Sequence, residues 1–395
     1  MAAAVSSALT LTLSGCSSDG TGHRPDPVPD RPDPKPGLVF RENPDWTLSH
    51  AQDVVVDDYG FKSDVDIISV NSLDDETYYL DVITADNFKN WYDSDLEAYI
   101  KDEPNYYNGE LYKGSTEVTF DRMRSGSWLA VAFGVKNGEI NGDYAVLRFT
   151  IQEDQPSEDF KRWLGKWTVK GASKSDPSRE ISYDLDITSS DADYLFYVTG
   201  WESGRSASVD MKDYGFETQY DRFTKTMLFK GLYLETETIS GKDYDLCFYG
   251  NFIYDGSMGF TDMKKGDEQT VCDNIIVAES SVMSGDGRSA TVDGLNFDFI
   301  HDNKTYRTKL TSMQYFDYPL DENDLGLYVK NSDIPVFPLT MTKVSDAAST
   351  MSVKVNAGRS MLMFRPQRRS PAHGIGVLTP VRTSVSSSVR RAGSR

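Results

Sequence analysis

The sequence predicts a mainly β protein, with a small N-terminal β-sandwich or sheet that carries one helix, followed by a larger antiparallel β-barrel or sandwich. Aromatic residues are abundant, with 22 Tyr and 19 Phe in 395 residues, and they suit half-buried pleated surfaces. Apolar and polar residues alternate in short runs, and these runs are separated by expected turns rich in Gly, Asp, Ser and Asn. A chain of this length implies about two or three domains.

The first fifteen residues predict a lipoprotein signal peptide. The apolar run of residues 2–13 leads into Leu13-Ser14-Gly15-Cys16, which resembles the lipobox of bacterial lipoproteins. The resemblance implies that residues 1–15 are removed and that Cys16 carries acyl chains such as palmitate. Two or more chains hold a protein stably on a membrane, because each buried methylene contributes about 0.8 kcal/mol. The acyl chains therefore predict an outer-membrane lipoprotein.

Residues 16–37 predict a stiff tether. Proline occupies nearly every second position of the stretch RPDPVPDRPDPKP, residues 24–36, which excludes a helix. Such a run favours an extended polyproline II conformation of about 3.1 Å per residue. The folded part should then stand roughly 40 Å from the membrane. Only Asp19 follows Cys16 as an acidic residue before the prolines, which leaves both a cell-surface and a periplasm-facing position open.

Residues 38–152 are predicted to form the N-terminal β domain. The apolar residues between Asp86 and Lys101 recur at spacings of three and four, which predicts one amphipathic helix. Asn137-Gly138 is a hairpin turn signal. Strands are expected at 65–70, 78–83, 117–120, 127–135 and 145–152. The polar, proline-broken residues 153–159 are expected to be an interdomain linker.

Residues 160–345 are predicted to form the second domain. After an opening run at 163–169, strands are expected at 181–188, 194–200, 227–238, 244–254, 270–278, 289–299, 306–311 and 339–344. Eight or more short strands favour an up-and-down barrel or a sandwich. The alternation stops after residue 345, so residues 346–395 are expected to be a disordered basic tail.

The charge excludes one class of partner. The chain carries a net charge of −20, although its last fifty residues are basic, and so the folded part should repel nucleic acid. Cys247 and Cys272 remain after Cys16 is lipidated, an even number for an oxidising compartment. They either form a disulfide or are two unrelated buried thiols.

Together the lipobox, the tether and the two β domains resemble surface and periplasmic lipoproteins of Bacteroidetes. Residues 127–135, SWLAVAFGV, followed by Gly142-Asp143-Tyr144-Ala145, are typical of their N-terminal modules. Gly165-Lys166-Trp167 resembles the Gly-x-Trp motif on the first strand of lipocalins, which implies a lipocalin-like barrel with Trp167 in its floor. Trp167 is therefore expected to be a core residue.

No catalytic motif stands out. The chain has four histidines, and a Ser-His-Asp triad would need His50 or His301, but no Gly-x-Ser-x-Gly elbow accompanies them. A hydrolase that uses two carboxylates stays open, yet the many acids single out no pair. The acidic stretches 191–193 and 321–324 match a calcium loop poorly, so no metal or cofactor is expected.

Aromatic side chains on loops are the candidate ligand contacts, because flat rings stack on sugars. Trp201 follows Gly200 at a strand end, where a loop would present it at a barrel mouth. Tyr106 and Tyr107 lie between Pro and Asn residues in an expected loop. Trp46 and Trp91 are weaker candidates, and simple packing is the alternative for all five.

The sequence thus favours a lipid-anchored extracytoplasmic binding protein without catalytic activity, which holds a glycan or a small apolar ligand. A structural or adhesive cell-surface subunit is the alternative, and a carboxylate-based hydrolase is weaker. An open cavity in residues 160–345 would favour ligand binding over a structural role.

Overall fold

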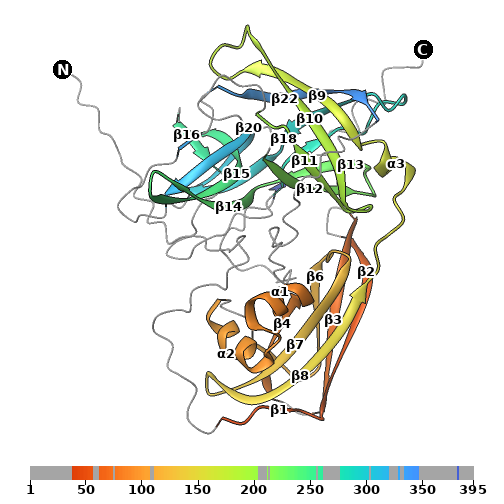
Figure 1. Cartoon of the computed structure of the whole chain (residues 1–395), viewed down its shortest axis with the longest axis vertical. Coiled ribbons are helices and arrows are strands. Elements are labelled where there is room, and N and C mark those ends of the chain that lie inside the picture. The colour runs from red at the N-terminus through yellow and green to blue at the C-terminus, as the bar shows by residue number, and fades with distance from the viewer. Residues whose placement is uncertain are drawn as a thin grey trace, which may run out of the picture.

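The computed structural model describes residues 38–56, 62–73, 76–106, 111–202, 211, 214–254, 257–260, 276–301, 304–319, 328–329, 333–346 and 380–381. The protein is mainly β and contains a closed antiparallel barrel of eight strands, as predicted. A smaller sandwich with two helices lies at one side of this barrel (Figure 1). None of the helices in the described ranges combines the length and the apolar character that crossing a membrane requires.

The N-terminal unit has three layers, and its strands form two sheets (Figure 1). One sheet has the order β1 (Arg41–Glu42), β8 (Glu139–Ile151), β7 (Gly126–Lys136), β4 (Thr77–Thr84) and β5 (Leu111–Lys113). The other has the order β2 (Trp46–Val56), β3 (Lys62–Ser72) and β6 (Thr116–Asp121). At the β7–β8 hairpin both Asn137 and Gly138 have positive φ, which confirms the predicted turn.

Strand β7 contributes to both cores of this unit, which explains why its sequence is almost entirely apolar. Trp128 and Ala130 face the sheet formed by β2, β3 and β6, where they pack with residues such as Phe120 of β6. Leu129 and Val131 face the helices instead and belong to a separate cluster. The sheet to which β7 belongs is therefore the middle layer.

The predicted single helix over 86–101 is wrong, because the structure divides it into α1 (Ala85–Tyr92) and α2 (Leu96–Tyr106). Asp93 adopts the left-handed conformation and its N–H bonds to the carbonyl of Phe88, which ends α1. The Asp95 carboxylate accepts hydrogen bonds from Glu97 N and Ala98 N and so caps the second helix.

The barrel runs through its strands in chain order, and each strand is antiparallel to its neighbours. The strands are β9 (Gly165–Ser173), β10 (Glu180–Asp191), β11 (Leu195–Thr199), β12 (Gly215–Asp221), β13 (Thr226–Lys230), β17 (Ile276–Ser280), β18 (Ser289–Gly294) and β22 (Pro335–Ser345). Pairing of β22 with β9 closes the ring.

A second sheet, which the sequence did not predict, packs on this barrel (Figure 1). Its strands are β14 (Leu232–Ile239), β15 (Lys242–Tyr254), β20 (Lys304–Pro319), β19 (Asn296–His301) and β23 (Pro380–Val381), with β16 (Ser257–Phe260) beside β15 and β21 (Tyr328–Val329) beside β20. The runs predicted at 227–238 and 289–299 are each two strands. In both, a single residue, Gly231 or Leu295, separates the barrel strand from the next strand of the second sheet.

Two expectations concern the ends of the second domain. The linker residues 153–159 are held by contacts, since Arg122 binds Asp154 and the Ser157 hydroxyl caps α3 (Glu158–Lys161). In the expected disordered tail, Pro380 and Val381 pair with β19, while the rest of residues 347–395 lies outside the described part.

Candidate functional site

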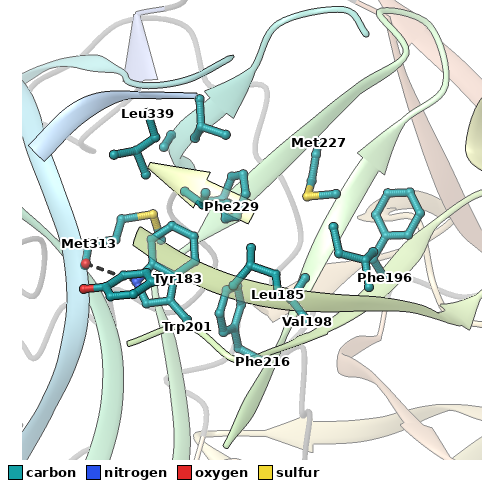
Figure 2. Packing of buried hydrophobic residues seen from close by; sticks show 14 of the residues in the cluster. Tyr183, Leu185, Phe196, Val198, Trp201, Phe216, Met227, Phe229, Met313 and Leu339 are labelled. Atoms are coloured by element: carbon teal, nitrogen blue, oxygen red, sulfur yellow. Dashed lines mark hydrogen bonds between the residues drawn. The ribbon is translucent and has the colours of Figure 1, made fainter. Parts of the chain in front are cut away.

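Trp201 lies within the packed core of the second domain and not at an open mouth (Figure 2). Its ring is 1% exposed and packs against Phe216, Phe229 and Phe248, at centroid distances of 5.6–5.9 Å. The indole N–H donates to the carbonyl of Met313 at 3.4 Å. The expectation of an exposed ring is wrong, because Phe248 and Met313 come from the second sheet, which covers this end of the barrel.

The turn that carries Trp201 is tightly constrained. Gly200 has a φ of 89°, and a Cβ at this position would collide with the carbonyl oxygen of Asp184. Glu202 has a φ of 62° and a fully buried side chain, whose Oε1 accepts a hydrogen bond from Tyr315 N at 2.8 Å. This turn therefore binds the barrel to strand β20.

Tyr315 packs against Phe216 and Phe248 in the same core as Trp201. Burial, and then the nearby charge of Glu202, raise the pKa of the Tyr315 phenol well above its usual value. Its ring is fully buried, and no described residue forms a hydrogen bond with its hydroxyl. A buried hydroxyl without a hydrogen-bond partner is uncommon in folded proteins.

The remaining sequence candidates fall in different places. Trp46 and Trp91 are buried, so neither offers an exposed ring. Tyr106 is the last residue of α2, but its side chain is not described. Tyr107, Cys16 and Cys272 lie outside the described residues, and Cys247 is buried in β15, so the lipidation and the disulfide stay predictions.

Trp167 is fully buried, which confirms its predicted core role. Its indole N–H donates to the carbonyl of Trp163 at 2.7 Å, and the two rings stack. The ammonium group of Lys343 lies 5.6 Å from the ring centre of Trp167 and donates to the carbonyl of Arg162. Lys343 was not predicted to lie here, because only the pairing of β22 with β9 brings it to Trp167 from 176 positions away.

His50 forms a partly buried contact in the N-terminal unit. Its Nε2 lies 2.7 Å from Oδ1 of Asp66, and its ring stacks on Phe149 at 4.2 Å. The other carboxylate oxygen of Asp66 accepts a hydrogen bond from Met123 N. Both acceptor oxygens of Asp66 are thus used to join β2, β3 and the loop after β6, which is a structural arrangement.

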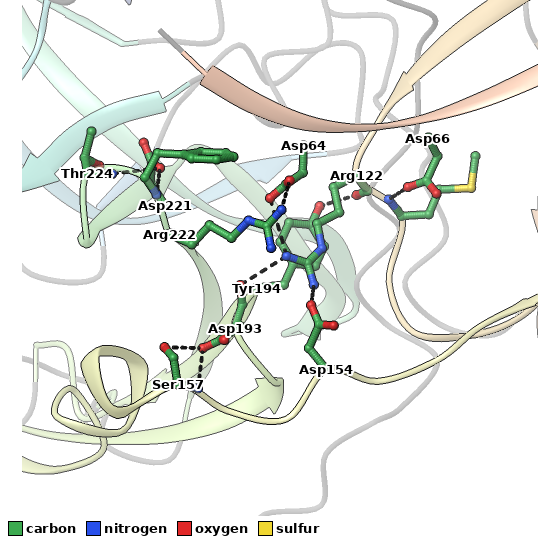
Figure 3. Close-up of polar contacts among 12 residues, drawn as sticks. Asp64, Asp66, Arg122, Asp154, Ser157, Asp193, Tyr194, Asp221, Arg222 and Thr224 are labelled. Atoms are coloured by element: carbon green, nitrogen blue, oxygen red, sulfur yellow. Dashed lines mark hydrogen bonds and ion pairs between the residues drawn. The ribbon is translucent and has the colours of Figure 1, made fainter. Parts of the chain in front are cut away.

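A group of charged side chains that was not predicted joins the two units (Figure 3). Arg122, in the loop 122–125 between β6 and β7, donates to the carbonyl of Asp193 at 3.2 Å and to Asp154 at 2.7 Å. Its guanidinium group lies 4.7 Å from the ring centre of Tyr194, whose hydroxyl donates back to the Arg122 carbonyl. From the barrel, Arg222 binds Asp64 of β3 at 2.5 Å.

Arg124 makes the second connection. It donates to both oxygens of Glu217, at 3.2 and 2.8 Å, and to the hydroxyl of Ser190 at 2.8 Å. A two-bond contact of this kind fixes orientation as well as distance. Next to it, Ser125 N donates to Oδ2 of Asp191 at 2.7 Å. Loop 122–125 thus reaches β10, the β10–β11 turn and β12.

These contacts account for the acidic stretch 191–193. Asp191 and Asp193 accept hydrogen bonds from Ser125 and Ser157, so they serve in this interface. Across the described part of the chain, no group of three or more His, Cys, Asp or Glu side chains is arranged to hold a metal ion. The sequence offers one cue to this interface, which is that two charged residues flank the apolar Met123 at 122–124. The structure buries Met123 in the sandwich core.

Asp191→Asn is expected to change how stability depends on pH. Burial raises the pKa of Asp191, and hydrogen bonds from Ser125 only partly offset it. A carboxyl group with a raised folded-state pKa stabilises the fold when it is protonated, and this contribution is lost as the pH rises through that pKa. The variant should therefore be more stable than the parent at pH 7, by about 1 kcal/mol, because Oδ1 of Asp191 is buried and accepts no hydrogen bond within the described residues.

Urea unfolding between pH 4 and pH 7 would measure this difference, which should shrink toward pH 4. Asp286→Asn is the control. A hydrogen bond from Ser284 lowers the pKa of Asp286, and the stability that this exposed carboxylate contributes is lost only at a lower pH, so the difference for this variant should stay nearly constant from pH 4 to pH 7. An Asp191→Asn difference that stays constant with pH would contradict the assignment.

Comparison of the chain with protein-family models, with curated proteins and with solved structures found no match.

Proposed function

We propose that this chain is a lipid-anchored extracytoplasmic protein without catalytic activity, which acts by presenting its outer surface to a partner as a structural or adhesive subunit. The observation that carries the proposal is the packed barrel. The side chains that fill it include Trp167, Trp201 and Phe216, each at most 1% exposed. A barrel that holds a ligand needs a cavity in that position, so binding through the outer surface is favoured.

The lipid anchor is the testable half of this proposal. Residues 13–16 carry the lipobox, and Cys16→Ala removes the only sulfur that can be acylated there. We expect the parent to partition with membranes and the variant to be released into the soluble fraction, because the anchor depends on the buried acyl chains. Mass spectrometry of the mature N-terminus and a salt wash of membranes would check this. Membrane retention of the variant after the wash would refute the anchor.

A glycan or small apolar ligand is the second candidate, and the Tyr315 hydroxyl favours it. That hydroxyl is buried without a hydrogen-bond partner among the described residues, at the barrel end that carries Trp201. A ligand there would have to separate the second sheet from the barrel. Binding of the full-length protein to glycan and fatty-acid panels tests it. Saturable binding that Tyr315→Phe weakens would favour this candidate over the structural one.

A further inference from the structure

The loop 122–125 is anchored in the N-terminal unit before it reaches the barrel. The Met123 side chain is 1% exposed in the sandwich core, and its N–H bonds to the buried Asp66. The Arg124 carbonyl accepts a hydrogen bond from the indole N–H of Trp128 at 2.9 Å. The loop is thus held at its base, and from there Arg122 extends toward the barrel (Figure 3), while Arg124 binds Glu217 of β12.

The barrel side of this contact is equally rigid. Asp191 and Tyr194 are each 2% exposed and belong to the β10–β11 hairpin, while Glu217 lies within β12. The side chains of Arg122 and Glu217 are only 13% and 10% exposed. Water screens such pairs much less than surface pairs, so breaking one leaves a poorly solvated charge.

We propose that loop 122–125 is a clamp that makes the N-terminal unit and the barrel one rigid body, with Arg122 and Arg124 as its two holding residues. Without the loop, the connection at residues 153–159 and the pair of the half-exposed Arg222 with Asp64 would still allow the units to turn, since interfaces between domains commonly permit motion. The clamp removes that freedom, because it fixes three separate segments of the barrel. The clamp therefore fixes the orientation of the barrel relative to residue 38, where the chain enters the N-terminal unit.

The test uses the full-length protein and the double variant Arg122→Ala/Arg124→Ala. The parent should unfold in one calorimetric transition, and the variant in two, because each unit keeps its own core. Segment 153–159 contains Glu153 and Glu158, so a protease that cleaves after Glu reports its exposure. We expect cleavage there to be at least about tenfold faster in the variant. Small-angle scattering should show a larger radius of gyration.

Arg179→Ala is the matched control, since Arg179 pairs with Asp333 within the barrel unit and away from the clamp. It should keep one transition and the parent's cleavage rate. If the double variant does not fold, Glu217→Gln replaces it, because that change removes the charge that Arg124 binds and keeps the side-chain shape. Faster cleavage in Glu217→Gln would support the clamp. A parent that already shows two transitions, or a variant that cleaves and scatters like the parent, would overturn it.

Discussion

Trp201→Ala is expected to destabilise the protein by about 3–5 kcal/mol, the usual cost of removing a large aromatic side chain from a packed core. The ring is 1% exposed and contacts aromatic residues from both the barrel and the second sheet. The variant would leave a cavity at the junction of the two sheets and would also lose the hydrogen bond to Met313. Trp167→Ala should cost a similar amount, since that ring is fully buried too.

Urea unfolding followed by circular dichroism measures these losses. Phe223→Ala is the control, because that ring is 37% exposed in the turn between β12 and β13 and should change stability by less than about 1 kcal/mol. If Trp201→Ala behaves like the control, then the ring does not belong to the core, and a ligand contact at Trp201 becomes the better explanation.

Asp66→Ala should have the next largest effect, a loss of about 3 kcal/mol. The carboxylate is fully buried and accepts from both Met123 N and His50, so its removal leaves two donors without their acceptor. The change also loosens the base of loop 122–125, where Met123 lies.

Asp66→Asn should cost clearly less, because an amide oxygen can still accept one of the two bonds. Thermal unfolding of both variants would rank them. Equal losses for Asn and Ala would mean that the charge of Asp66, and not its hydrogen-bond acceptors, holds this region.

Turns and strands could be predicted where a few neighbouring residues determine the local structure. The Asn137-Gly138 turn formed as expected because both residues tolerate positive φ. Five strands of the N-terminal unit, β3, β4, β6, β7 and β8, were predicted from local apolar patterns. The 11-residue strand β2 was not predicted, because most of its side chains are exposed. The helix at 86–101 failed at Asp93-Ser94-Asp95, because the apolar spacing continues across a break that the two aspartates cap.

The second sheet and the packing of Trp201 could not be predicted in the same way. The runs at 227–238 and 289–299 read as single strands, since nothing in their alternation marks where the chain leaves the barrel. An exposed position for Trp201 was inferred from its place after a strand. Its burial depends on Phe248 and Met313, which lie far away in the sequence. The same holds for Arg124 and Glu217, which only the fold brings together.

The closing seam of the barrel has a consequence for how this chain acquires its structure. Thr168 of β9 lies opposite Thr342 of β22, so the ring closes only after almost the whole second domain has emerged. Folding is slow when contacts join residues far apart in sequence, and unpaired strands are then exposed to aggregation. The chain therefore has two unpaired strand edges until β22 has emerged, and its folding yield should depend on chaperones more than its final stability suggests.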